Sequence, residues 1–116
     1  MPTTLIYHNP RCSKSRQALQ LLQDNGITPE IKEYLKNPPS VEELKQLIDL
    51  LEIKPRDLLR TKENEFKEAG LDNLALDDTA VIEAMIRFPK LIERPIVIHD
   101  GKARIGRPPE QVLELL

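Results

Sequence analysis

The 116-residue chain has a single cysteine, Cys12, so no disulfide can form within it. It also has almost no net charge, with 17 Lys and Arg against 19 Asp and Glu, and so no overall field that would attract a nucleic acid or an anionic membrane. No segment approaches the roughly 18 apolar residues of a membrane span, and the first residues do not read as a secretory signal. We therefore expect a cytoplasmic protein that binds neither nucleic acid nor membranes.

The composition is that of a globular protein, with 40% hydrophobic and 31% charged residues. The length predicts one domain over residues 1–116 that folds without a disulfide or a metal ion to hold it together. A lone thiol in a reducing compartment is either an inert apolar side chain or a reagent. The residues around Cys12 in the sequence therefore have to show whether the thiol is inert or reactive.

The first part of the chain has the pattern of a strand, a helix and a second strand. Residues 4–7 form a short β-type run, and residues 13–25 place apolar side chains on one helical face before Gly26. Residues 29–35 then alternate polar and apolar side chains, which indicates a strand. Strand, helix and strand in this order favour a parallel pair joined by a right-handed crossover.

The middle of the chain has short helical patterns, and the last part returns to strands. A capping box at Ser40–Glu43 starts helical patterns that continue to about residue 88. Residues 96–99 and 102–105 predict a hairpin around Asp100-Gly101, a type I′ turn signal. Two prolines then suit the first turn of a last helix, for which we expect the apolar residues Val112, Leu113 and Leu116.

The order β-α-β, helices, β-β-α predicts an α/β protein with a thioredoxin-like fold. We expect a mixed four-stranded sheet and a helical insertion at about residues 40–88. In this plan a cis-proline usually stands directly before a strand, and Arg94-Pro95 occupies that place.

Cys12 falls where the loop after the first strand becomes the first helix. Unpaired backbone N–H groups and the positive end of the helix dipole favour its thiolate, the reactive form. The neighbours, Arg11 and residues 13–16, are too polar for a core, which favours a reactive over a buried cysteine. His8, four residues earlier, is either placed beside the sulfur or a hydrogen-bonded loop residue. We expect His99, beside the hairpin turn, to be solvated.

Several motifs carry a resemblance to a known family. Residues 8–16 match the pattern H-x3-C-x3-R, and further matches follow in order: Tyr34-Leu35, Asn37-Pro38-Pro39-Ser40, Leu58-Leu59-Arg60, Glu93-Arg94-Pro95-Ile96-Val97 and Arg107-Pro108. With these motifs the chain resembles the ArsC family of glutathione- and glutaredoxin-coupled arsenate reductases, in its short YfgD-like branch. The resemblance covers nearly the whole chain and implies a single ArsC-type domain.

The resemblance implies a role for each matching residue. Cys12 corresponds to the nucleophile that attacks arsenate and His8 to the histidine that tunes it. The oxyanion-binding arginines correspond to Arg60, Arg94 and Arg107, and the supporting residues to Arg16, Ser15 and Pro95. Guanidinium groups suit this task because they are always charged and offer several donors in one plane. The other interpretation of these arginines is a set of surface ion pairs, with Glu63 beside Arg60 and Glu93 beside Arg94.

The resemblance also implies the reaction partners. Arsenate or a similar oxyanion is the substrate, glutathione is a co-substrate and glutaredoxin is a partner, with no metal and no tightly bound cofactor. Because the chain has one cysteine, the resolving thiol has to come from outside.

Two other functions stay open. One is a general glutathione-dependent thiol or disulfide reductase that does not require arsenate. The other is a transcription regulator like the Spx proteins, which share the fold and bind RNA polymerase. Redox-sensing regulators of that group typically have C-x-x-C, whereas this chain has Ser15 at the last position.

Overall fold

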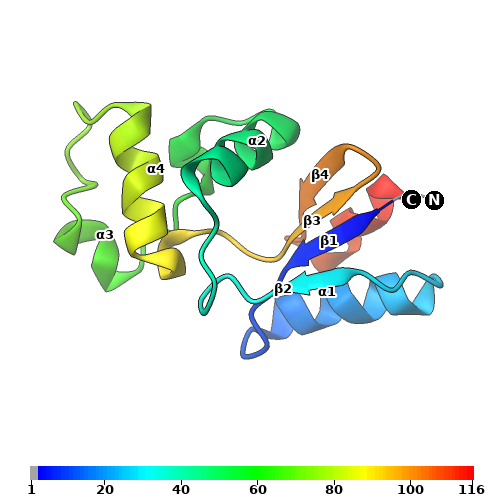
Figure 1. The fold of residues 1–116 in the computed structure, drawn as a ribbon. Helices are drawn as coiled ribbons and strands as arrows, with labels where there is room; N and C mark the ends of the chain where they lie inside the picture. Colours follow the sequence, from blue (N-terminus) through cyan, green and yellow to red (C-terminus); the bar gives the residue numbers. More distant parts are fainter. Residues whose placement is uncertain (1–2) are drawn as a thin grey trace. The chain divides into compact units, whose positions relative to one another are not determined.

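A mixed four-stranded sheet in the order β2-β1-β3-β4 forms the frame of the protein (Figure 1). The computed structural model describes residues 3–116, and the chain forms two compact units. Unit 1 comprises Met1–Asn37 and Arg94–Leu116, and unit 2 comprises Pro38–Glu93. All four strands lie in unit 1: β1 (Thr4–Tyr7), β2 (Glu30–Lys32), β3 (Ile96–His99) and β4 (Lys102–Ile105).

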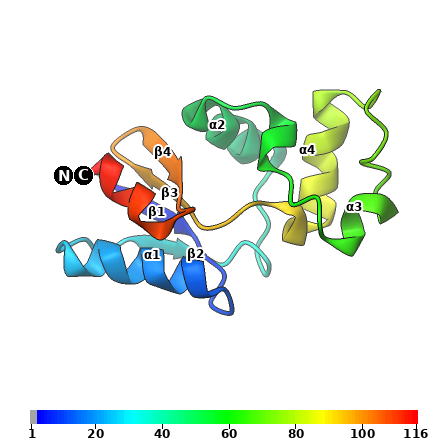
Figure 2. The same ribbon diagram turned by 180° about the vertical axis from the view of Figure 1, so that it is seen from behind.

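Two helical segments of unit 1 cover one face of this sheet (Figure 2). They are α1 (Ser13–Asp24) and the 3-10 helix η3 (Pro109–Leu115). The core beneath them joins both helices to the two central strands through Ile6, Ala18, Leu22, Val97, Val112 and Leu115. β1 pairs parallel to β2 and antiparallel to β3, and β3 pairs antiparallel to β4. The predicted thioredoxin-like fold with a mixed sheet is therefore confirmed.

The turn between β3 and β4 has the predicted backbone. Asp100 and Gly101 have φ values of 50° and 76°. Positive φ at both central residues is the type I′ geometry, whose twist matches that of the strands it joins.

β2 is shorter than the alternating pattern of residues 29–35 predicts. Its partner β1 ends at Tyr7, which pairs with Lys32, and the His8 N–H makes the next bond to the Lys32 carbonyl at 2.9 Å. Beyond this point the chain turns, and Tyr34 is buried with its ring edge against Tyr7, at 6.4 Å between centroids. The strand therefore ends three residues before the predicted bound, because the chain turns after Lys32.

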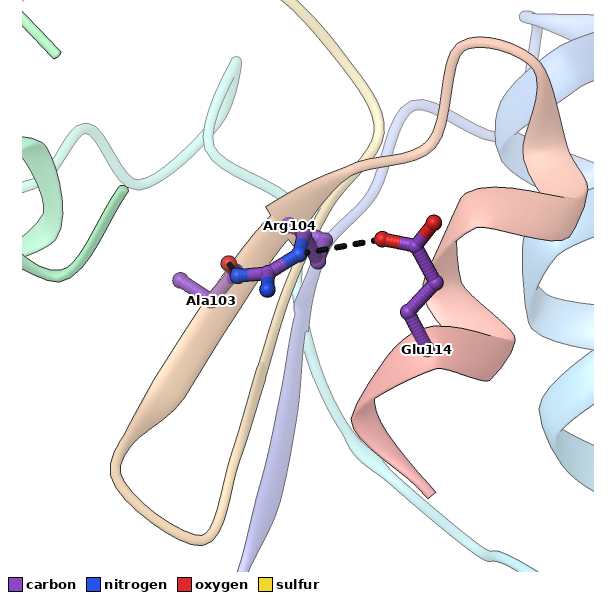
Figure 3. A network of polar contacts seen from close by, with 3 residues as sticks. All are labelled: Ala103, Arg104 and Glu114. Atoms are coloured by element: carbon purple, nitrogen blue, oxygen red, sulfur yellow. Dashed lines mark hydrogen bonds and ion pairs between the residues drawn. The ribbon is translucent and has the colours of Figure 1, made fainter. Parts of the chain in front are cut away.

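The last helix is a 3-10 helix, and this geometry decides which of its apolar residues are buried. Because η3 is a 3-10 helix with three residues per turn, residues three apart lie on the same side. Val112 and Leu115 are the buried pair, whereas Leu116 follows the helix and is 48% exposed. A polar contact also joins η3 to the sheet: Nε of Arg104 in β4 donates to Oε1 of Glu114 at 3.2 Å (Figure 3).

His99 also differs from the prediction. It is partly buried, and its Nδ1 lies 2.6 Å from Oγ1 of Thr4 on the neighbouring strand. The expectation of a solvated ring was wrong because β1 and β3 pair Thr4 with His99 across 95 residues of sequence.

Unit 2 is helical. Its elements are α2 (Val41–Leu51), the 3-10 helix η1 (Pro55–Leu58), α3 (Asn64–Glu68), α4 (Asp78–Arg87) and the 3-10 helix η2 (Pro89–Leu91). The predicted capping box is present at the start of α2. The Ser40 hydroxyl accepts a hydrogen bond from the Glu43 N–H, and the Glu43 carboxylate accepts one from the Ser40 N–H, both at 3.1 Å. An isolated bridge between Leu59 and Ile92 brings the two sides of the unit together. No helix within residues 3–116 is long and apolar enough to cross a membrane.

Candidate functional site

A tight turn delivers Cys12 to the start of α1. The side chain of Asn9 accepts from the Arg11 N–H at 3.0 Å, which is the bond of an Asx turn. The Asn9 carbonyl accepts from the Cys12 N–H, also at 3.0 Å. The sequence analysis gave Asn9 no role, although an Asn-Pro pair is a known turn signal.

Cys12 is the N-cap residue of α1. Its backbone is extended, with φ −94° and ψ 122°, and its carbonyl accepts from the Arg16 N–H at 3.0 Å. The side chain makes no capping hydrogen bond, and the residue is partly exposed. Cys12 therefore stands at the end of the helix where backbone N–H groups lack intrahelical acceptors. Its role as a nucleophile stays a prediction.

Ser15, in the first turn of α1, ties His8 to the loop. Its side chain is fully buried, and its Oγ lies 2.7 Å from Nδ1 of His8. The same Oγ accepts from the Asn9 N–H at 3.0 Å. Within residues 3–116 the hydroxyl proton has no other acceptor, so Ser15 donates to Nδ1. His8 is thereby held as a neutral imidazole that carries its proton on Nε2.

The surroundings of His8 act in the same direction. The residue is only 7% exposed, and this burial is the main cause that lowers its pKa below the usual value of 6.5. The carboxylate of Glu33 raises the pKa of His8, and the guanidinium of Arg16 lowers it. The net effect favours the uncharged ring, and the role of His8 in tuning Cys12 stays a prediction.

Arg16 completes the sequence motif and has a structural contact of its own. Its Nη1 donates to the carbonyl of Pro10 at 2.8 Å, which joins the second turn of α1 to the loop before Cys12. Arg16 thus closes the loop while it adds positive charge near His8.

Arg94 and Arg107 come together in unit 1. Nε of Arg107 donates to the Arg94 carbonyl at 2.8 Å, and the Gly106 N–H donates to the Pro95 carbonyl at 2.8 Å. The Arg94-Pro95 bond is cis, as predicted, and so is Arg107-Pro108. The structure thus brings together two of the three arginines predicted to bind the oxyanion, from positions 13 residues apart.

Gly106 allows these two segments to meet α1. A Cβ atom at this position would lie 2.8 Å from Cγ of Pro95, 3.2 Å from Cγ1 of Val112 and 3.5 Å from Cβ of Ala18. No side chain fits there, so only glycine lets Pro95 pack this closely. The sequence analysis noted no need for a glycine directly before Arg107.

Arg60 lies in unit 2, after η1. Its N–H donates to the Leu91 carbonyl at 2.7 Å, and its Nη2 lies 3.5 Å from Oε1 of Glu63. The ion pair with Glu63 that the sequence left open is therefore present. Nη1 of Arg60 is buried and has no hydrogen-bond partner among residues 3–116. The role of Arg60 in oxyanion binding stays a prediction.

A pocket of about 290 Å³ lies beside the Cys12 loop in unit 1. Its lining combines the loop with the turn after β2: His8, Asn9, Pro10, Arg11, Glu33, Leu35 and Lys36. The sequence analysis did not connect these two segments, because it used Tyr34-Leu35 only as a family match and gave residues 33–36 no role in a site. Within residues 3–116 no group of three or more His, Cys, Asp or Glu side chains could hold a metal ion.

Known proteins are similar to this chain over nearly its whole length. The "Uncharacterized protein YfgD" of Escherichia coli is 53% identical over 112 residues, which cover 96% of this chain and 94% of the relative. The "Arsenate reductase" of Neisseria meningitidis is 47% identical over 117 residues, which cover all of both chains. The solved structure "Arsenate reductase from Vibrio cholerae" is 53% identical with a TM-score of 0.95, and the match covers 98% of each chain.

The model of the ArsC family matches residues 7–115, which run from the end of β1 through η3. This match includes the Cys12 loop, both units and the segment of Arg94 and Arg107. The chain belongs to the ArsC family.

Proposed function

We propose that the protein is an arsenate reductase that uses Cys12 as its nucleophile. The observation that carries the proposal is the position of Cys12, a partly exposed residue at the N-terminus of α1 whose side chain makes no capping bond. The helix dipole places partial positive charge at this end of α1, which suits an anionic nucleophile. Relatives with 47% and 53% identity that are named arsenate reductases support arsenate as the substrate.

In the first step the Cys12 thiolate attacks the arsenic of arsenate. An As–S bond forms and an oxygen leaves as hydroxide or, after protonation, as water. Arg94 and Arg107 lower the charge repulsion between thiolate and oxyanion, because their guanidinium groups donate hydrogen bonds to the arsenate oxygens. The Nε2–H of His8 is the donor that remains for the sulfur or its adduct, since Nδ1 is bound to Ser15.

The second step reduces arsenic with an external thiol. Glutathione sulfur attacks the Cys12 sulfur, and the electron pair of the As–S bond stays on arsenic, which becomes trivalent and leaves as arsenite. Cys12 and glutathione are then joined in a mixed disulfide. Because Cys12 is the only cysteine, a second external thiol has to break this disulfide, and glutaredoxin is the proposed donor.

A coupled assay tests this function. Arsenate, glutathione, glutaredoxin, glutathione reductase and NADPH are mixed with the protein, and NADPH oxidation is followed. We expect oxidation that requires arsenate and that Cys12→Ser abolishes, while Ser13→Ala, an exposed change one residue away, keeps it. Equal oxidation without arsenate would contradict the proposal and favour a general glutathione-dependent reductase.

A further inference from the structure

The pocket beside the Cys12 loop has a mixed lining. Its lining includes two cationic side chains, Arg11 and Lys36, and one anionic side chain, Glu33. It also includes the apolar side chains of Pro10 and Leu35. Leu35 is 39% exposed, which makes it one of the few large apolar side chains at the surface. The pocket therefore offers both charge and an apolar contact to a small ligand.

The charged groups of the pocket are available to a ligand. Nζ of Lys36 lies 3.7 Å from Oε1 of Glu33, but the two side chains are 77% and 40% exposed. Ion pairs this exposed contribute little to stability, so a ligand can replace them at small cost. Within residues 3–116 the Arg11 guanidinium has no hydrogen bond or ion pair, since only the Arg11 N–H is bonded.

We propose that this pocket binds the thiol co-substrate, a small peptide with two carboxylates and one ammonium group such as glutathione. Arg11 and Lys36 bind the carboxylates, Glu33 binds the ammonium, and Leu35 packs against the peptide. The pocket's net charge of one positive unit complements the single negative unit of the peptide. This inference rests on the proposed function, because it locates the reductant of the same reaction.

The location suits a thiol that has to reach Cys12. Arg11 lines the pocket and is the residue directly before Cys12, so the two Cα atoms are about 3.8 Å apart. An extended tripeptide spans roughly 10 Å, more than twice the spacing of neighbouring Cα atoms, so a peptide bound at Arg11 can extend toward Cys12. The turn after β2 thus supplies part of the site although it is distant in sequence.

A binding experiment tests the pocket apart from catalysis. S-methylglutathione, which cannot react, is titrated into ¹⁵N-labelled Cys12→Ser protein, and amide shifts are followed by NMR. We expect saturable shifts at residues 8–11 and 33–36. The charge reversals Arg11→Glu and Lys36→Glu should each weaken binding by at least about fivefold. Lys102→Glu, an exposed change of the same charge outside the pocket, should stay within about twofold.

Kinetics provide a second measurement. Lys36→Glu should raise the KM for glutathione and leave the KM for arsenate unchanged. Shifts elsewhere, or reversal variants that bind like Lys102→Glu, would overturn the pocket assignment while arsenate reduction stands. Specific binding without arsenate-dependent turnover would support the pocket and reject arsenate as the substrate.

Discussion

Replacing Ser15 with alanine removes one hydroxyl and leaves two polar groups without their hydrogen-bond partner. Nδ1 of His8 and the N–H of Asn9 both lose their partner at 2.7 and 3.0 Å, in a place where Ser15 itself is fully buried. Each polar group without a partner lowers the free energy of unfolding by about 1–3 kcal/mol, and the better helix propensity of alanine offsets roughly 0.5 kcal/mol of this loss. We expect the free energy of unfolding to fall by about 1.5–5.5 kcal/mol, which lowers Tm by roughly 6–22 °C.

The same change should alter the state of His8. Without the Ser15 donor the neutral ring loses a stabilising bond, so the pKa of His8 should rise toward its usual value. NMR titration of the ring nitrogens measures both the pKa and the protonated nitrogen. Ser13→Ala is the control, because Ser13 is exposed in the same helical turn and should leave both quantities unchanged. An unaltered His8 titration in Ser15→Ala, or a wild-type proton on Nδ1, would refute the hydrogen-bond assignment.

Three further predictions follow from the site. Gly106→Ala should lower the free energy of unfolding by about 1–3 kcal/mol through overpacking and raise the KM for arsenate, whereas Gly26→Ala, strained at φ 79° in open space, should lower stability alone. Because the pKa of His8 is lowered in the folded state, the unfolded chain binds a proton first as pH falls. Unfolding free energy measured by urea titration should therefore drop below about pH 6.5, and His8→Asn should flatten this slope. Arg94→Lys should raise the KM for arsenate about tenfold, because a point charge replaces a planar set of donors, while Arg104→Lys should not; equal effects would assign Arg94 a structural role.

Local signals in the sequence predicted the elements that depend on neighbouring residues. The capping box at Ser40, the type I′ turn at Asp100-Gly101 and the position of Cys12 at the start of α1 were all predicted correctly. Each depends on backbone geometry and hydrogen bonds within a few residues, so the local residue types are sufficient. The same locality explains why the predicted β-α-β and β-β-α segments were confirmed.

Tertiary structure decided which side chains of those elements contact one another. Strand pairing placed His99 against Thr4, and the 3-10 geometry of η3 selected Leu115 over Leu116 for the core. The contact of Arg107 with the Arg94 backbone and the need for glycine at residue 106 arise where separate segments pack.

The sequence by itself determined that the single cysteine lies at a loop-to-helix junction, because that position is a local property. Only the folded chain decided which groups surround it. The hydroxyl of Ser15 becomes the partner of His8 when the Asn9 turn reverses the chain, and the turn after β2 reaches the Cys12 loop only through parallel pairing with β1. Such contacts depend on side-chain packing between distant segments, for which no short sequence pattern exists.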